Sequence, residues 1–128
     1  MPRILIIDPD PFNCRRLKET LSNAGYFVDS ASNGKLALKE LQEQRVHLVI
    51  TEMVMPEMDG VEIIQTLRRD YPKIKLLALC GDGIVSADRY LRLARTLGAH
   101  QVVAKPYTQE EILYAVINVL ADQGSDIK

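Results

Sequence analysis

Five residues whose side chains could support a binding site stand out within three residues of the end of a short apolar run. They are Asp8, Asp10, Glu52, Cys80 and Lys105. In an open α/β sheet the carboxyl ends of the parallel strands meet at one edge, and ligands bind in the crevice outside them. Carboxylates can hold a divalent cation such as Mg²⁺, and a lysine can bind anionic oxygens. If the apolar runs are parallel strands, we expect these side chains to form one site.

The apolar runs have the composition of buried parallel strands. Most are rich in β-branched residues or leucine, and the longer runs do not alternate with polar residues, as expected for strands covered on both faces. The predicted strands are Ile4–Ile7, Tyr26–Val28, Val46–Ile50, Ile74–Leu79 and Val102–Ala104.

Stretches with helical spacing separate these runs. Gly25 and Gly98 are placed to end two of them, and Thr108 with Glu111 forms a capping box that opens the last. Strand–helix alternation repeated five times predicts a parallel sheet with helices on both faces. The apolar stripes are Cys14, Leu17, Leu21 and Ala24; Leu38 and Leu41; Val61, Ile64 and Leu67; Leu91, Ala94 and Leu97; and Ile112, Ala115, Val116 and Val119.

Length and composition limit the function classes. The chain has 128 residues, of which 47% are hydrophobic and 26% charged, so we expect one core: a domain over residues 1–121 and a polar tail over 122–128. The net charge of −1 argues against a nucleic-acid partner for this domain. The apolar runs are far shorter than the roughly 20 residues a bilayer requires, which argues against a membrane partner. Cys14 and Cys80 lack disulfide or zinc-ligand spacing, which favours a cytoplasmic protein.

Several motifs, in the expected order, resemble the receiver domains of two-component response regulators. Ile4–Asp8 is similar to the first strand and first acid of that family. Leu48–Gly60, which ends in Met-Pro-Glu-Met-Asp-Gly, is similar to its acceptor strand and loop. Leu97–Ala99 and Lys105–Tyr107 are similar to its Gly-Ala turn and Lys-Pro motif. The resemblance covers nearly the whole chain and implies a flavodoxin-like three-layer sandwich, with a five-stranded parallel sheet in the order 2-1-3-4-5 and five helices.

The resemblance also implies a chemistry, which is the transfer of a phosphoryl group to an aspartate. It further implies that the chain is a signalling module and not an enzyme. In the family, two acids after the first strand and the acceptor hold Mg²⁺, which neutralises the phosphoryl charge. A Ser or Thr after the fourth strand and a lysine after the fifth bind the phosphoryl oxygens. We expect the Lys105–Pro106 peptide bond to be cis, as is usual in the family, so that Lys105 points into the acidic pocket.

This chain departs from the family pattern at four positions. Glu52 stands at the phosphoacceptor position, and its carboxylate is one methylene farther out than that of Asp; a misplacement of about 1 Å can cost about 10²-fold in rate. Pro9 replaces the second acid and offers no ligand atom. Cys80 replaces Ser or Thr, and Val102 replaces the aromatic switch residue. We therefore expect signalling with little or no phosphorylation and no required cofactor. The competing outcome is a weak Mg²⁺ site, with ligands from Asp8, Asp10 and Glu52.

The same residues also have purely structural interpretations. Asp8 is placed to cap the helix that begins near Pro11. Glu52 and Lys105 can form an ordinary, partly buried ion pair, which is compatible with signalling because it would hold the lysine permanently. Cys80 has no adjacent base in the sequence and fits a small packed residue.

The expected partners are proteins, either a histidine kinase or a downstream effector, and a homodimer is a further form. Arg89, Arg92 and Arg95 recur every three residues in the helix that ends at Gly98. They belong either to a solvated face or to the docking surface that the family often builds from this helix, the strand Val102–Ala104 and the last helix.

Other functions fit parts of the sequence. The first is a working Mg²⁺-dependent phosphoacceptor receiver. The second is a small phosphohydrolase of the haloacid-dehalogenase type, whose signature of an apolar strand followed by Asp-x-Asp matches Ile6–Asp10; Phe12, however, stands where that family has Thr or Val. A flavin-binding flavodoxin fits less well, because the loop after the first strand is acidic and lacks phosphate-cradling glycines and hydroxyls.

Overall fold

The computed structural model describes residues 1–53, 55, 60–81 and 87–122. The centre of the Met-Pro-Glu-Met-Asp-Gly motif (56–59), the residues 82–86, most of the predicted tail (123–128) and the side chain of Leu91 lie outside this described part. The expected boundary of the domain at residue 121 therefore stays a prediction.

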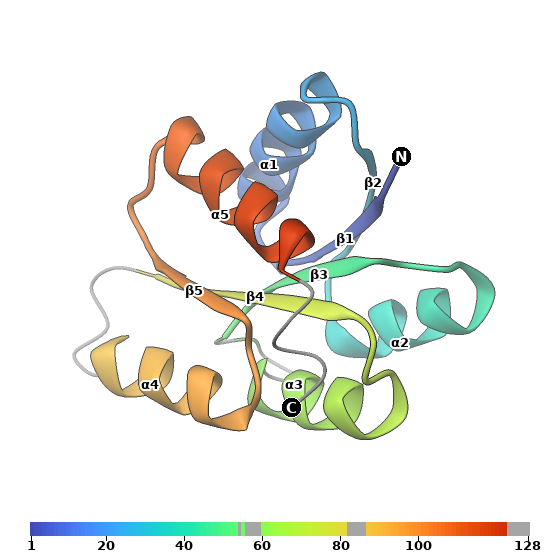
Figure 1. Cartoon of the computed structure of the whole chain (residues 1–128), viewed down its shortest axis with the longest axis vertical. Helices are drawn as coiled ribbons and strands as arrows, with labels where there is room; N and C mark the ends of the chain where they lie inside the picture. Colours follow the sequence, from blue (N-terminus) through green and yellow to red (C-terminus); the bar gives the residue numbers. More distant parts are fainter. Residues whose placement is uncertain (54, 56–59, 82–86, 123–128) are drawn as a thin grey trace.

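Strand and helix alternate five times along the described chain, as predicted (Figure 1). The strands are β1 (Arg3–Ile7), β2 (Phe27–Ala31), β3 (Leu48–Glu52), β4 (Lys75–Cys80) and β5 (Gln101–Ala104). The helices are α1 (Pro11–Asn23), α2 (Gly34–Glu43), α3 (Gly60–Asp70), α4 (Ala87–Leu97) and α5 (Gln109–Ala121).

The five strands form one parallel sheet in the order β2-β1-β3-β4-β5, which confirms the predicted topology. The register aligns the strand ends, since Ile7 pairs with Thr51, Thr51 with Ala78, and Ala78 with Val102. The residues that follow these positions therefore reach the same edge of the sheet.

Helices cover both faces of the sheet, with α1 and α5 on one side and α2, α3 and α4 on the other (Figure 1). Each face has its own hydrophobic core. Leu17 and Leu21 of α1 pack with Ile112 and Val116 of α5 on the first face. On the second face the core includes residues of α2, α3 and α4, such as Leu41, Ile64 and Ala94, and the fold is thus a three-layer sandwich.

Strand boundaries differ from the predicted ones by up to three residues. The central strands β1, β3 and β4 are almost wholly buried, as the unbroken apolar runs predicted. β2 lies at the edge of the sheet, so it tolerates Asp29 and Ser30 and continues to Ala31 rather than ending at Val28. β3 begins and ends two residues later than predicted, which makes Glu52 its last residue.

Helix α1 ends one residue earlier than its predicted apolar stripe. Ala24 is the C-cap and is exposed, so it takes no part in the buried stripe of the helix. The following glycine has the role that the sequence predicted, because Gly25 has a φ of 101°. Gly98 ends α4 in the same way with a φ of 120°. None of the helices described is both long and apolar enough to cross a membrane.

Candidate functional site

Asp8 lies at the carboxyl edge of the sheet, directly after β1, and only 2% of it is exposed. Its Oδ1 accepts a hydrogen bond from the backbone N–H of Asp10 at 2.9 Å, and its Oδ2 accepts one from Asn13 Nδ2 at 2.6 Å. Lys105 Nζ lies 3.7 Å from the same Oδ2. A buried carboxylate requires such donors because desolvation disfavours its charge, and all of them come from within the chain.

Asp10 does not share this pocket, which corrects its assignment to the acidic pocket. Asp10 is the N-cap of α1: its carboxylate accepts a hydrogen bond from the N–H of Phe12 at 3.0 Å, and the residue is exposed. Pro11 at the first position of the helix fixes the chain direction there. The capping role that the structural interpretation gave to Asp8 therefore belongs to Asp10, and Asp8 is the pocket acid.

Glu52 ends β3 with its side chain in the pocket, where it is 6% exposed. Its Oε1 accepts a hydrogen bond from Lys105 Nζ at 2.5 Å, and its Oε2 accepts one from the N–H of Met53 at 3.0 Å. Both oxygens of the residue at the acceptor position thus have a donor inside the chain. This is the ion pair that the structural interpretation predicted.

Lys105 is held between the two carboxylates. Burial opposes its charge more strongly than any other single effect, but the hydrogen bond and the charge of Glu52, together with the charge of Asp8, outweigh it and raise the pKa of Lys105 above its ordinary value. The lysine is therefore charged at neutral pH. The predicted cis peptide bond between Lys105 and Pro106 is confirmed.

Cys80 and Val102 have surroundings that fit packing better than chemistry. Cys80 is fully buried at the end of β4. Burial, and next the charge of Glu52, raise the pKa of its thiol, so it is protonated at neutral pH. Val102 packs as a partly buried residue against the core on the face covered by α2, α3 and α4.

Asn13 and Tyr107 extend the pocket toward α1 and α5, although neither is among the site residues predicted from the sequence. Asn13 donates to Asp8 and accepts a hydrogen bond from the hydroxyl of Tyr107 at 3.4 Å. Burial raises the pKa of this hydroxyl more than the charge of Lys105 lowers it. A signal for Asn13 existed: it shares a helix face with Leu17 and Leu21 at i, i+4 and i+8, which places a polar residue on a buried stripe.

The pocket offers Mg²⁺ fewer ligands than the family chemistry uses. Mg²⁺ needs near-octahedral oxygen coordination, with one or two carboxylates and several further oxygens. Pro9 supplies no side-chain ligand, Asp10 is turned to the helix cap, and the oxygens of Asp8 and Glu52 are engaged by donors. Within the ranges described, no three His, Cys, Asp or Glu residues are grouped so as to hold a metal ion.

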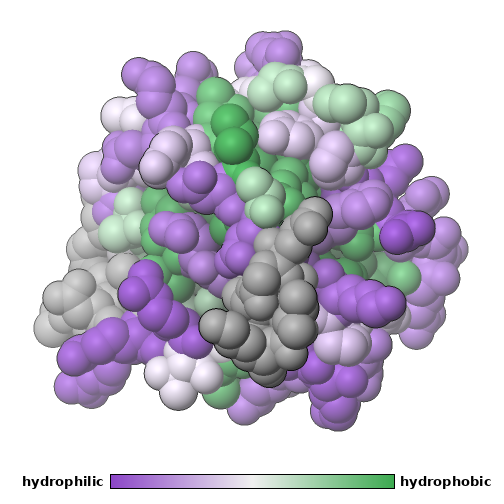
Figure 2. Space-filling view, viewed as in Figure 1, coloured by the Kyte–Doolittle hydropathy of each residue, from purple (hydrophilic) through white to green (hydrophobic). Residues whose placement is uncertain are grey.

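The three arginines of α4 lie apart from this pocket. Arg89, Arg92 and Arg95 are all exposed and share one side of the helix, since three-residue steps bring them close together. In Figure 2 the surface over α4 is mostly hydrophilic. The exposed residues of α5 include two large hydrophobic ones, Tyr114 at 70% and Ile117 at 54%.

The family model described as "Response regulator receiver domain" matches residues 4–117 of this chain. The response regulator receiver protein CpdR of Brucella abortus is 31% identical over 120 residues, which cover 94% of this chain and 98% of CpdR. A "Probable transcriptional regulator ycf27" of Guillardia theta is 40% identical over 113 residues. These cover 86% of this chain but only 42% of that relative, so the chain spans less than half of its length.

Solved structures agree with this match. The response regulator protein TrrA of Thermotoga maritima, determined in complex with Mg²⁺–BeF, has a TM-score of 0.81 and 30% sequence identity, covering 93% of this chain and 99% of TrrA. The chemotaxis protein CheY4 of Vibrio cholerae has a TM-score of 0.82 and 26% identity, covering 93% of this chain and 98% of CheY4.

Proposed function

This chain belongs to the response regulator receiver family of two-component signalling, and we propose that it signals as a protein-interaction module with little or no phosphorylation at its acceptor position. One observation carries the proposal, which is the hydrogen bond of 2.5 Å between Lys105 Nζ and Glu52 Oε1. The lysine that would bind an incoming phosphoryl group is thereby already bound to a carboxylate. Glu52 supplies, within the chain, a negative charge close to where the phosphoryl group would add one.

The surroundings of Glu52 support the same proposal. A nucleophilic carboxylate needs a free oxygen directed at the phosphorus atom, and an error of about 1 Å in its position costs about 10²-fold in rate. Here the second oxygen accepts from Met53 N–H, and the residue is almost fully buried. The paired acid of the family is replaced by Pro9, so the expected Mg²⁺ affinity is weak and no cofactor is required. The orientation of Asp10 argues against phosphohydrolase chemistry, because this second acid of the Asp-x-Asp signature caps α1 and faces away from the pocket.

The proposed partners are proteins, a histidine kinase or a downstream effector, in the cytoplasm. Cys14 and Cys80 are free thiols, which suits a reducing compartment. The proposed contact surface is the one formed by α4, β5 and α5. The positive charge of this surface comes from Arg89, Arg92 and Arg95. Such a surface is complementary to an acidic surface on a partner protein or, in a homodimer, to an acidic part of a second copy.

Phosphorylation is tested by intact-mass analysis after incubation with acetyl phosphate and Mg²⁺. We expect the wild-type chain to keep its unmodified mass. The matched control is the double variant Pro9→Asp/Glu52→Asp, which restores both acids of the family pattern and is expected to gain one phosphoryl group and to bind Mg²⁺ more tightly by calorimetry. A stable phosphoryl group on Glu52 of the wild type would overturn the proposal in favour of a working phosphoacceptor.

Signalling through the fixed pair is tested at the same residue. Glu52→Gln leaves Lys105 facing Asp8 alone, so we expect weaker binding to a partner, or greater mobility near the ends of β3 and β4 in amide exchange. Glu52→Asp keeps the charge and is expected to change partner binding little. Unaltered signalling in cells that carry Glu52→Gln would count against a signalling role for this charge.

A further inference from the structure

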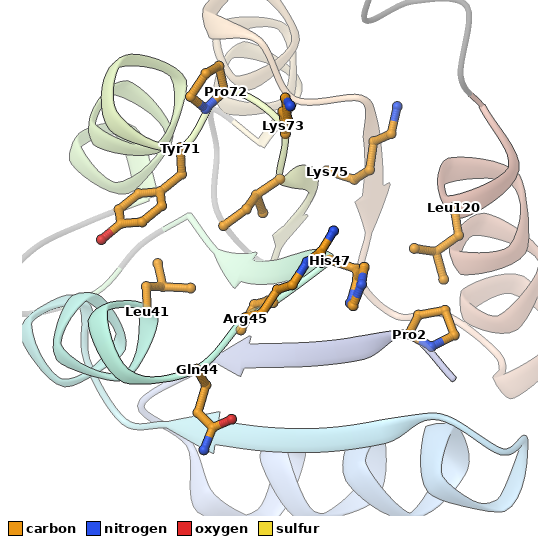
Figure 3. Close-up of a pocket in the computed structure, with 12 residues that line it drawn as sticks. Pro2, Leu41, Gln44, Arg45, His47, Tyr71, Pro72, Lys73, Lys75 and Leu120 are labelled. Carbon is orange, nitrogen blue, oxygen red and sulfur yellow. The ribbon is translucent and has the colours of Figure 1, made fainter.

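A large cavity lies at the amino edge of the sheet, at the opposite end of the strands from the acidic pocket. Its volume is about 640 Å³, which is within the range of small-molecule sites. Figure 3 shows Tyr71 and Leu41 on one side of this cavity and Leu120 and Pro2 on the other, with Arg45 drawn between them. The cavity thus joins the ends of α2, α3 and α5 to the start of β1, and we call it the amino-edge pocket.

The wall of the amino-edge pocket is mainly apolar. Leu41, Val46 and Ile74 are buried residues of the hydrophobic core that also line it, and Tyr71 and Leu120 are partly buried beside them. Small-molecule sites have this composition, with an apolar lining and a few polar groups that fix orientation.

The charged residues that line this pocket are all basic. Arg45 and Lys73 are exposed, and Lys75 is 8% exposed. Among the described lining residues there is no Asp or Glu. Cations that share a low-dielectric wall attract an anion more strongly than scattered surface cations do. The pocket therefore combines an apolar wall with a positive field.

Backbone hydrogen bonds fix the lining segments in place, so the pocket exists before a ligand binds. The N–H of His47 donates to the Arg3 carbonyl at 2.9 Å, and the N–H of Lys75 donates to the His47 carbonyl at 3.0 Å. The Lys75 ammonium donates to the carbonyl of Asp122, which ties the end of α5 to the start of β4. A preformed site costs little ordering on binding.

We propose that the amino-edge pocket binds a small amphipathic anion, with a carboxylate or phosphate head group and an apolar body. The apolar wall accepts the body, and Arg45 and Lys73 attract the head group. Such a ligand would contact the ends of three helices at once, far from Glu52. The inference depends only on this pocket and not on whether Glu52 is phosphorylated.

The test is a titration of the ¹⁵N-labelled chain with decanoate, followed by amide chemical shifts. We expect saturable shifts at the amides of residues 44–47, 71, 73–75 and 120. Decanol and decyltrimethylammonium, which share the apolar body but are neutral and cationic, are expected to bind more weakly. Equal binding of the three probes, or no shifts at these residues, would overturn the proposal.

Paired variants test the charge. Arg45→Ala/Lys73→Ala removes two exposed cations of the pocket and is expected to raise the dissociation constant of decanoate roughly tenfold. Lys35→Ala/Lys39→Ala removes two exposed cations of α2 outside the pocket and should leave the constant unchanged. Equal effects of the two pairs would show non-specific attraction and would contradict the proposal. Shifts at the same residues that depend on protein concentration without decanoate would show that a second copy fills the pocket, and this too would overturn it.

Discussion

At the carboxyl edge of the sheet, Lys105 lies between Glu52 and Asp8, whereas at the amino edge Arg45 and Lys73 share a pocket wall with no carboxylate among its described residues. The same strands support both edges. At the first edge the charges are opposite, both carboxylates are buried, and Lys105 is hydrogen-bonded to Glu52. At the second edge the charges are alike, and the most exposed of them face solvent.

This difference determines which edge is available to a ligand and which edge stabilises the fold. Buried opposite charges satisfy one another, and removal of one leaves its partner desolvated and unpaired. Exposed like charges gain little from one another, so their removal costs little stability. The carboxyl edge is therefore expected to be sensitive to mutation and resistant to ligands, and the amino edge the reverse.

The largest expected effect comes from removal of the central cation of the carboxyl edge. Lys105→Met leaves Asp8 and Glu52 close together without a counter-charge, and we expect it to lower the free energy of unfolding by about 3 kcal/mol at pH 7. Urea denaturation measures this loss. Glu52→Gln/Lys105→Met should recover part of it, because the double variant has one buried carboxylate fewer. A loss below about 1 kcal/mol in the single variant would contradict this account.

Removal of one acid is expected to have a smaller effect that depends on pH. Glu52→Gln should cost about 1–2 kcal/mol at pH 7, since it weakens a hydrogen bond between two charged groups. Glu52 raises the pKa of Lys105 in the folded protein above the ordinary value of 10.5, so this contribution is complete below that value and is lost as pH rises through the folded pKa.

The pH dependence separates this pair from other causes of lost stability. Urea denaturation between about pH 10 and about pH 12 should show a steeper fall of the free energy of unfolding in the wild type than in Glu52→Gln. The charge of Glu52 also raises the pKa values of Tyr107 and Cys80, so both proteins carry Tyr107→Phe and Cys80→Ala to keep these groups out of the comparison. Parallel curves would mean that the pair does not contribute as described.

Asp10 lies next to the carboxyl edge but outside its charge network, so its removal should resemble the loss of any helix cap. Asp10→Ala is expected to cost about 1 kcal/mol, and Asp10→Ser should retain most of the stability. Thr108→Ala, at the N-cap of α5, is the matched control of similar size. If Asp10→Ala lowered the free energy of unfolding as much as Lys105→Met does, in thermal or urea unfolding, Asp10 would belong to the charge network of the pocket.

The smallest effect is expected at the amino edge. Arg45→Ala/Lys73→Ala should change the free energy of unfolding by no more than about 0.5 kcal/mol, because both side chains are exposed and like-charged. Urea denaturation of this variant beside Lys105→Met compares the two edges directly. A loss of free energy of unfolding in Arg45→Ala/Lys73→Ala as large as that in Lys105→Met would contradict the difference between the two edges.

Local patterns in the sequence determined much of the molecule. Unbroken apolar runs predicted the central strands, because strands buried on both faces need no polar residues. Gly25, Gly98 and the pair Thr108 and Glu111 predicted helix ends, because caps are formed by neighbours in the chain. The resemblance to the receiver family predicted the strand order and the cis bond before Pro106. The positions of Glu52 and Lys105 at the ends of their strands predicted that they meet.

Only the tertiary structure decided which way side chains turn and which distant segments meet. Asp8 and Asp10 look equivalent in the sequence, but they turn in opposite directions. Asp10 turns outward to cap α1, whereas Asp8 turns inward, where it accepts a hydrogen bond from Asn13 and lies beside Lys105. Asn13 and Tyr107 lie 94 residues apart and meet only because α1 packs beside α5. The amino-edge pocket is formed by four separate segments of the chain, so no local pattern marks it. Periodicity and capping are set by neighbours in the chain, whereas a pocket depends on how the elements pack together.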